Sequence, residues 1–243
     1  MNNRKLILLS NLVLVSSYIY AGDMGLAEVP DSLKRLYIRG DIGANFFNSS
    51  QVDTSGSDYN YLISPSASIS NSVGYTGGLG YQFFPKLRGD VTFSYRPNLN
   101  VKVLDNTPEA GTGTLKNYTV MANLYLDIDY FNLPIVPYFM AGIGSSWFNG
   151  YNNLYWPVPQ INEYGQTKQN FAWQLGAGAS YKIFENFLMD INYQYLAIGT
   201  ASYTGHYDRY APAAFTQSLY GAPTQFNNVY DNQIQIGLRY YMS

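Results

Sequence analysis

The feature that most constrains the fold is a strict two-residue alternation between residues 170 and 199. In residues 171–182, apolar side chains occupy the odd positions, with aromatics near both ends, and small or polar side chains occupy the even positions. Residues 189–195 repeat the pattern after a short turn at 183–186. Alternation with a period of two predicts β-strands. An apolar face that ends in aromatics, opposite a polar face, is typical of the wall of a transmembrane β-barrel.

The composition agrees with a barrel but also with a secreted β-rich protein. Charged residues make up only 12% of the 243 residues, whereas a soluble domain usually has about a quarter. Aromatics make up 17%, with 25 Tyr and 13 Phe. The mean hydropathy of −0.17 is too polar for a helical membrane protein. It fits strands that expose every second residue to lipid.

Cysteine usage and net charge exclude several classes of function. The chain has no cysteine, which rules out disulfides, thiolate zinc sites and cysteine nucleophiles. A net charge of −2 gives no electrostatic support for a nucleic-acid partner.

The N-terminal residues predict export from the cytoplasm. Residues 1–5 are basic, residues 6–20 are mostly apolar, and Ala21 and Gly22 are small, as at a cleavage site. We therefore predict a signal peptide at residues 1–21, followed by a short periplasmic lead at 22–35. The alternative is a single membrane anchor, but the apolar run is shorter than the roughly 20 residues that a span needs. Membrane insertion must then use strands.

The whole chain predicts an eight-stranded antiparallel up-and-down transmembrane β-barrel at residues 36–243. Long and short connections alternate regularly along the chain, as in barrels with long extracellular loops and short periplasmic turns. A soluble sandwich, the alternative fold, does not account for this regularity. The predicted strands are 36–47, 72–83, 87–96, 115–129, 137–148, 171–182, a strand through 189–195, and 231–242, with long loops at 48–71, 97–114, 149–169 and 200–228.

The polar face of the strands predicts a charged lumen. Eight strands leave an interior that side chains can fill, and buried charges need partners. A salt-bridged plug is therefore our main interpretation, and a charge-lined ion path is the alternative. The inward set contains five basic and five acidic residues: Arg39, Asp41, Arg88, Asp90, Arg96, Asp127, Asp129, Lys182, Asp190 and Arg239.

The sequence predicts no catalytic residue, cofactor or metal site. His206, the only histidine, lies near Asp208, and such a pair could supply part of a general base. One histidine among Tyr and Gly is more often plain surface, and no metal-binding motif is present. The glycine-rich runs GAGAS and GGLG lie within strands, so neither is a phosphate-binding loop.

Aromatic side chains also occur in the predicted long loops. Exposed Tyr and Trp among Ser, Gly and Asn favour contact with another protein. Packing of these rings on one another or on the lipid headgroups is the alternative. The residues are Tyr59, Tyr61, Tyr151, Tyr155, Trp156, Tyr203, Tyr207, Tyr210, Phe215 and Tyr220.

Several segments resemble a known family. The hairpin at 170–199, the run PYFMAGIG at 137–144 and the run LYIRGDIG at 36–43 are similar to strands of small outer-membrane β-barrel proteins, the opacity-protein-like and porin-like surface antigens. The resemblance implies an eight-stranded barrel in a Gram-negative outer membrane. The final residues QIGLRYYM resemble the insertion signal read by the barrel-assembly machinery, although the chain ends Met-Ser rather than on an aromatic. The matching residues are Gln235, Gly237, Tyr240 and Met242.

Together these features predict a non-enzymatic outer-membrane barrel with a structural, surface-antigen or adhesin role through its long extracellular loops. The expected partners are outer-membrane lipid, the barrel-assembly machinery, and a host or envelope ligand at the loops. A small porin-like channel for ions or small solutes is the main alternative. A lipid-modifying enzyme that uses His206 is a third class.

Overall fold

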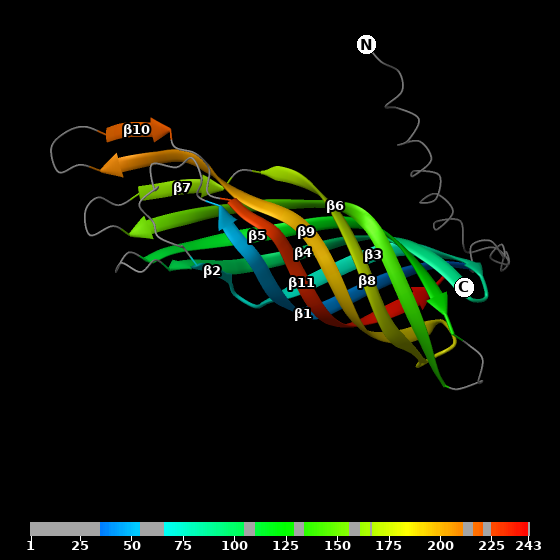
Figure 1. Ribbon diagram of the computed structural model, residues 1–243. Helices are drawn as coiled ribbons and strands as arrows, with labels where there is room; N and C mark the ends of the chain where they lie inside the picture. The colour runs from blue at the N-terminus through cyan, green and yellow to red at the C-terminus, as the bar shows by residue number, and fades with distance from the viewer. Residues whose placement is uncertain are drawn as a thin grey trace, which may run out of the picture.

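The computed structural model describes residues 35–53, 66–104, 110–128, 134–155, 161–165, 167–210, 216–220 and 225–242. Eight long strands follow one another around a closed antiparallel ring, in the order β1–β3–β4–β5–β6–β8–β9–β11, and β11 pairs again with β1 (Figure 1). This confirms the predicted eight-stranded barrel. The long strands are β1 (Leu36–Asp53), β3 (Ser72–Phe84), β4 (Leu87–Leu104), β5 (Ala110–Asp127), β6 (Ile135–Tyr155), β8 (Lys168–Lys182), β9 (Phe187–Tyr210) and β11 (Gln225–Tyr241).

Closure of the ring satisfies the backbone along the barrel. The first strand pairs on one side with the last, where Arg39 lies opposite Arg239, and on the other side with β3, where Arg39 lies opposite Gly78. A closed sheet has no unpaired edge, which is the condition for strands to cross lipid. Within the described residues, no helix combines the length and apolar character needed to cross a membrane.

The two ends of the barrel differ. At one end, which we call the turn end, β3 joins β4 through residues 85–86, β8 joins β9 through residues 183–186, β1 begins and β11 finishes. At the other, extended end, strands run well past the barrel (Figure 1). Three short strands pair with them there: β2 (Ser66–Ile69), β7 (Ile161–Gly165) and β10 (Thr216–Tyr220).

The prediction of long loops was therefore partly wrong. β4 continues to Leu104, and β5 already begins at Ala110, so most of the loop predicted at 97–114 is a paired hairpin. β9 likewise continues to Tyr210, inside the loop predicted at 200–228. Alternation marks a strand only where one face is apolar. Beyond a lipid-facing belt neither face has to be apolar, so backbone pairing can continue without that pattern.

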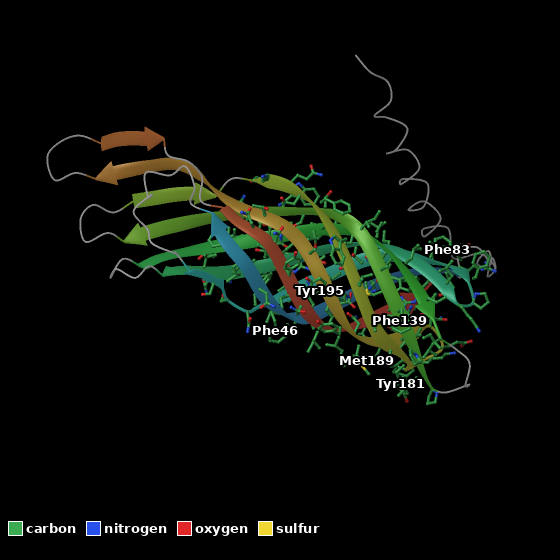
Figure 2. All side chains as sticks on the ribbon, in the orientation of Figure 1. Phe46, Phe83, Phe139, Tyr181, Met189 and Tyr195 are labelled. Atoms are coloured by element: carbon green, nitrogen blue, oxygen red, sulfur yellow. The ribbon has the colours of Figure 1, made fainter. Side chains whose placement is uncertain are left out.

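The outer face of the barrel carries a belt of exposed apolar side chains. Aromatic rings lie near both rims, and Figure 2 shows Phe46, Phe83, Phe139 and Tyr181 pointing away from the barrel. At the extended side, the rings of Tyr195 and Tyr230 stack with centroids 5.5 Å apart. An apolar band between aromatic girdles is the outer surface of a transmembrane barrel.

Three β-bulges change which side chains point inward. Each contains one residue with positive φ: Asn98 (54°) in β4, Gly199 (83°) in β9 and Asn228 (52°) in β11. In β4, Arg96 pairs with Asn117 but the next pair is Leu99 with Leu115, so β4 has one extra residue. An extra residue reverses the alternation beyond the bulge.

Candidate functional site

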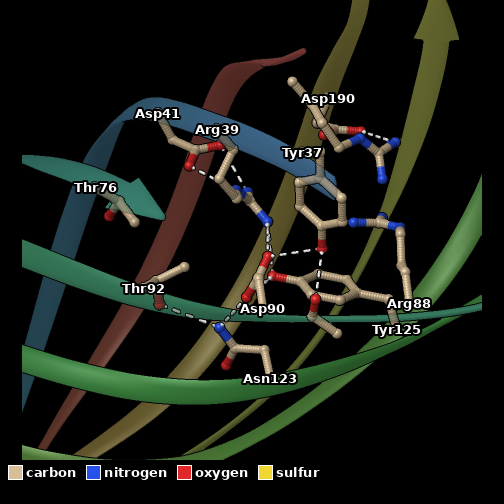
Figure 3. A network of polar contacts seen from close by, with 12 residues as sticks. Tyr37, Arg39, Asp41, Thr76, Arg88, Asp90, Thr92, Asn123, Tyr125 and Asp190 are labelled. Carbon is tan, nitrogen blue, oxygen red and sulfur yellow. Dashed lines mark hydrogen bonds and ion pairs between the residues drawn. The ribbon is translucent and has the colours of Figure 1, made fainter. Parts of the chain in front are cut away.

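A charge network fills the lumen toward the turn end (Figure 3). Arg39 of β1 donates to both carboxylate oxygens of Asp41, at 2.9 and 2.7 Å. It also reaches Asp90 of β4 at 3.3 Å and the Tyr125 hydroxyl of β5 at 2.6 Å. All four side chains are buried. Burial of these charges is tolerable because each has an opposite charge or a hydrogen-bond partner.

Asp90 is the centre of this network. Besides Arg39, it accepts hydrogen bonds from the hydroxyls of Tyr37 and Tyr125, both at 3.2 Å, and from the Asn123 amide at 2.8 Å. Asn123 in turn accepts a hydrogen bond from Gln174 of β8 at 2.6 Å. The carboxylate thereby joins side chains from four strands, β1, β4, β5 and β8.

Two further arginines lie between aromatic rings at the turn end. The Arg88 guanidinium is 4.0 Å from the ring centroid of Tyr125 and 4.6 Å from that of Tyr138. Its Nε is 3.1 Å from Asp127. Such cation–π contacts are stronger when the cation is desolvated, and Arg88 is fully buried.

Arg239 of β11 forms an ion pair similar to that of Arg88, on another part of the barrel wall. Its Nη2 lies 3.2 Å from Asp190 of β9 and donates to the Ser180 hydroxyl of β8 at 2.9 Å. The ring centroids of Tyr37 and Tyr241 are 5.5 and 5.6 Å from its guanidinium carbon. These contacts connect three consecutive strands of the barrel wall, β8, β9 and β11.

A separate ion pair lies nearer the extended end. Arg96 Nε donates to Asp231 across the lumen at 2.9 Å, and its Nη1 donates to Asn117 at 2.9 Å and to Thr119 at 3.0 Å. Asp231 also accepts a hydrogen bond from Gln233 at 2.6 Å. From there, a ladder of amides leads back toward the turn end, formed by Gln233, Gln235, Gln194 and Asn192.

Inward glycines provide the space for these long side chains. A Cβ on Gly80 would overlap the ring of Tyr37, and one on Gly142 would overlap the Asn123 amide. At Gly178 it would lie 2.6 Å from the Tyr138 ring. The lumen is therefore packed with side chains rather than open along its length.

Beyond the Arg96–Asp231 pair, the interior becomes apolar. We call this cluster the apolar layer. Leu99 and Val101 follow the bulge of β4 toward the extended end, whereas Met121, opposite Thr92, lies on the turn-end side of the ion pair. Its members are Phe47, Ile69, Leu99, Val101, Leu115, Met121, Phe148, Ala172, Leu196, Ile198, Ala201, Phe226 and Val229.

The structure brings most of the predicted charged residues together inside the barrel. The prediction that Lys182 faces the lumen was wrong. Lys182 lies at the last position of β8, where the barrel opens, and its side chain is exposed. Asp129 lies outside the described residues. The residues found in buried or partly buried ion pairs are Arg39, Asp41, Arg88, Asp90, Arg96, Asp127, Asp190 and Arg239.

The sequence analysis missed several members of the lumen. Asp231 has the same alternation as Gln233, Gln235 and Arg239, so its position in β11 could have identified it. Tyr37 could have been identified in the same way, because it lies two residues before Arg39 in β1 and therefore on the same face of the strand. Part of the apolar layer could have been identified in the same way, because Phe47, Leu115 and Phe148 keep the alternation of the inward residues of their strands. Leu99, Val101, Ala201 and Phe226 give no such signal, because a bulge puts them out of phase with the inward residues.

The proposed insertion signal forms the closing seam of the barrel. Gln235 faces the lumen, and a Cβ on Gly237 would overlap the Asp41 carboxylate, so this glycine provides room for the charge network. Tyr240 packs on Phe187, with ring centroids 4.7 Å apart. The Met242 amide donates to the Leu36 carbonyl at 2.9 Å. Recognition of these residues by an assembly machinery stays a prediction.

The remaining predicted positions lie partly in strands of the extended end. His206 and Asp208 belong to β9 and pair with Tyr220 and Ser218 of β10. Tyr151 and Tyr155 belong to β6, and Tyr203, Tyr207 and Tyr210 to β9. Residues 1–34, Tyr59, Tyr61, Trp156 and Phe215 lie outside the described residues. Among the residues that are described, no three His, Cys, Asp or Glu side chains form a group suited to a metal ion.

Comparison with known proteins gives consistent matches over most of the chain. The sequence model of the outer membrane protein beta-barrel domain matches residues 21–241. PagN, an outer membrane protein of Salmonella typhimurium, is 26% identical over 84% of this chain and 89% of its own length. A Rickettsia conorii protein that is provisionally named an adhesin is 22% identical over 85% of this chain and 82% of its own length.

Solved structures agree on the fold. AlkL, an outer membrane protein, matches with a TM-score of 0.54 and 13% identity, over 91% of this chain and 96% of its own. OprG of Pseudomonas aeruginosa matches with a TM-score of 0.52 and 17% identity, over 85% of this chain and 96% of its own. At such low identity, these matches show the barrel architecture alone.

Proposed function

Because the chain belongs to the outer membrane protein beta-barrel domain family, we propose that it is a closed barrel whose extended end serves as a surface-exposed binding platform, with an adhesin-like role. The family and the Salmonella relative place it in the Gram-negative outer membrane. The barrel fold and the outer-membrane location both agree with the family resemblance found in the sequence. The turn end then faces the periplasm, and the extended end faces the exterior.

One observation carries this proposal: paired strands project beyond the lipid-facing belt at the extended end, while the lumen is packed. Strands β6, β7, β9 and β10 pair with one another there, which makes a firm support for the connections between them. A role at the surface agrees with the names of the Salmonella and Rickettsia relatives. The proposal includes no enzymatic activity.

Binding to surfaces tests the proposal directly. Bacteria that display the barrel on an otherwise non-adherent strain should attach to host cells or envelope material. A variant in which residues 204–220 are replaced by a two-residue turn removes the hairpin of β9 and β10 but leaves the lipid-crossing part of β9 intact. It should lose attachment while still migrating as a folded, heat-modifiable barrel on gels. Equal attachment by both proteins would contradict the proposal.

A small channel is the competing function, favoured by the many charges in the lumen. We propose instead that the charge network is a plug, because its members pair with one another across the ring. Purified barrel in planar bilayers should therefore show no steady, ion-selective current. Reproducible unit conductance would support the channel and overturn the plug.

A further inference from the structure

We propose that the apolar layer is the permeability seal of this barrel: it closes the lumen toward the exterior and leaves the charge network in contact with water from the periplasmic side alone. The proposal concerns the lumen and does not depend on what the extended end binds. It assigns to a particular set of residues the barrier function that the charge network alone would otherwise have to provide.

Exposure changes in one direction along the lumen. At the periplasmic turn end, the Asp127 side chain is 13% exposed although it pairs with Arg88. At the opposite boundary of the polar interior, Asp231 is 0% exposed and Arg96 is 2% exposed. Water therefore reaches the network at the turn end, while its other boundary is covered.

The cover consists of apolar side chains from seven of the eight ring strands, all except β3, together with Ile69 of the short strand β2. Phe47 comes from β1, Leu99 from β4, Leu115 from β5 and Phe148 from β6, and β8, β9 and β11 contribute the others. Leu99 and Phe226 are both 0% exposed, so neither side of the layer leaves them open to water. An ion that crossed the layer would lose its hydration shell without receiving a polar partner, which is costly.

The bulges bring part of the layer into the lumen. Arg96 and Leu99 both point inward although they are three residues apart, because the bulge at Asn98 lies between them. In β11, the bulge at Asn228 likewise lets Phe226 and Val229 both point inward although they are three residues apart. Without these bulges, the inward positions beyond the ion pair would include Asn98 and Asn100 instead of Leu99 and Val101. In β4 and β11, backbone geometry thus brings apolar side chains into the lumen, whereas Phe47, Leu115 and Phe148 reach it without a change of phase.

Cysteine labelling tests the seal, since the protein has no native cysteine. Ser146→Cys places a near-isosteric thiol directly below Phe148, at a position that is 0% exposed. Lys168→Cys is an exposed reference, and Gln82→Cys reports on the turn end. Each folded variant, in micelles, is treated with a small cationic thiosulfonate. Ser146→Cys should react at least about 100-fold more slowly than Lys168→Cys.

Truncating the layer should open it. In a Leu99→Ala/Phe226→Ala background, the Ser146→Cys rate should rise about tenfold or more, while the Gln82→Cys rate stays the same. The matched control truncates two lipid-facing residues, Ile143→Ala/Leu175→Ala, and should leave both rates unchanged. Heat-modifiable migration identifies the folded fraction in every case. Rapid labelling of Ser146→Cys with an intact layer would overturn the proposal, as would a rate that truncation does not change.

Discussion

The two halves of the lumen are built on the same eight strands but are filled by different chemistry. Toward the turn end, charged and aromatic side chains interlock around Asp90, Arg88 and Arg239. Toward the extended end, the apolar layer fills the interior of the same barrel with side chains such as Leu99 and Phe226. The strands are continuous through both halves, and in β4, β9 and β11 a bulge lies within or next to the apolar layer.

Because one half is polar and the other apolar, the two halves should respond differently to substitution. A polar network depends on each member having its partner, because an unpaired buried charge is costly. An apolar layer depends on volume, because a lost side chain leaves a cavity. Each half can therefore be tested by the change to which it should be most sensitive.

The largest effect is expected in the polar half, for Asp90→Ala. The substitution removes the acceptor of four donors, Arg39, Tyr37, Tyr125 and Asn123. We expect the free energy of unfolding to fall by about 3–5 kcal/mol, as when one partner of a buried ion pair is removed. Urea unfolding of the barrel in lipid vesicles measures this loss of unfolding free energy. Asp90→Asn keeps the shape and one acceptor, so it should cost less; an equal loss for both would argue against the hydrogen-bonding explanation.

Leu99→Ala should have the corresponding effect in the apolar half. Removing a fully buried leucine from a packed layer should cost about 2–5 kcal/mol of unfolding free energy. Leu175→Ala is the control, because Leu175 is 54% exposed on the lipid side and its loss leaves no cavity. The same urea titration applies to both variants. If the two losses are equal, the apolar layer is not packed as a core.

Glycines distinguish the packed interior from the outer wall at smaller cost. Gly80→Ala introduces a methyl group against the Tyr37 ring and should lower the unfolding free energy by about 1–3 kcal/mol through overpacking. Gly77 belongs to the same strand, but a Cβ there would have no atom within 4 Å. Gly77→Ala should therefore be close to neutral in the same measurement. A neutral Gly80→Ala would mean that the ring of Tyr37 moves freely.

The polar half could be predicted from the sequence, and the apolar half only in part, since Phe47, Leu115 and Phe148 keep the inward phase of their strands but other members lie beyond a bulge. In their strands, Arg39, Asp90 and Arg239 occupy every second position, between residues that face the lipid. Their inward position therefore follows from the alternation. Leu99 and Val101 come after the bulge at Asn98, where the phase reverses. In the unshifted phase, they would point outward. No rule of alternation places a bulge, and Pro97-Asn98 also favours a turn, which is why this segment was predicted to be a loop.

The bulge at Asn98 allows the smallest test of the comparison. Asn98 has a φ of 54°, which glycine adopts freely, asparagine tolerates and alanine adopts only with strain. We therefore expect Asn98→Gly to change the unfolding free energy by less than about 0.5 kcal/mol, and Asn98→Ala to lower it by about 1 kcal/mol. Since Asn98 is exposed, lost packing cannot explain a difference between them. If Asn98→Ala is as stable as Asn98→Gly, the left-handed residue is not needed at this bulge. The inward turn of Leu99 would then need another cause.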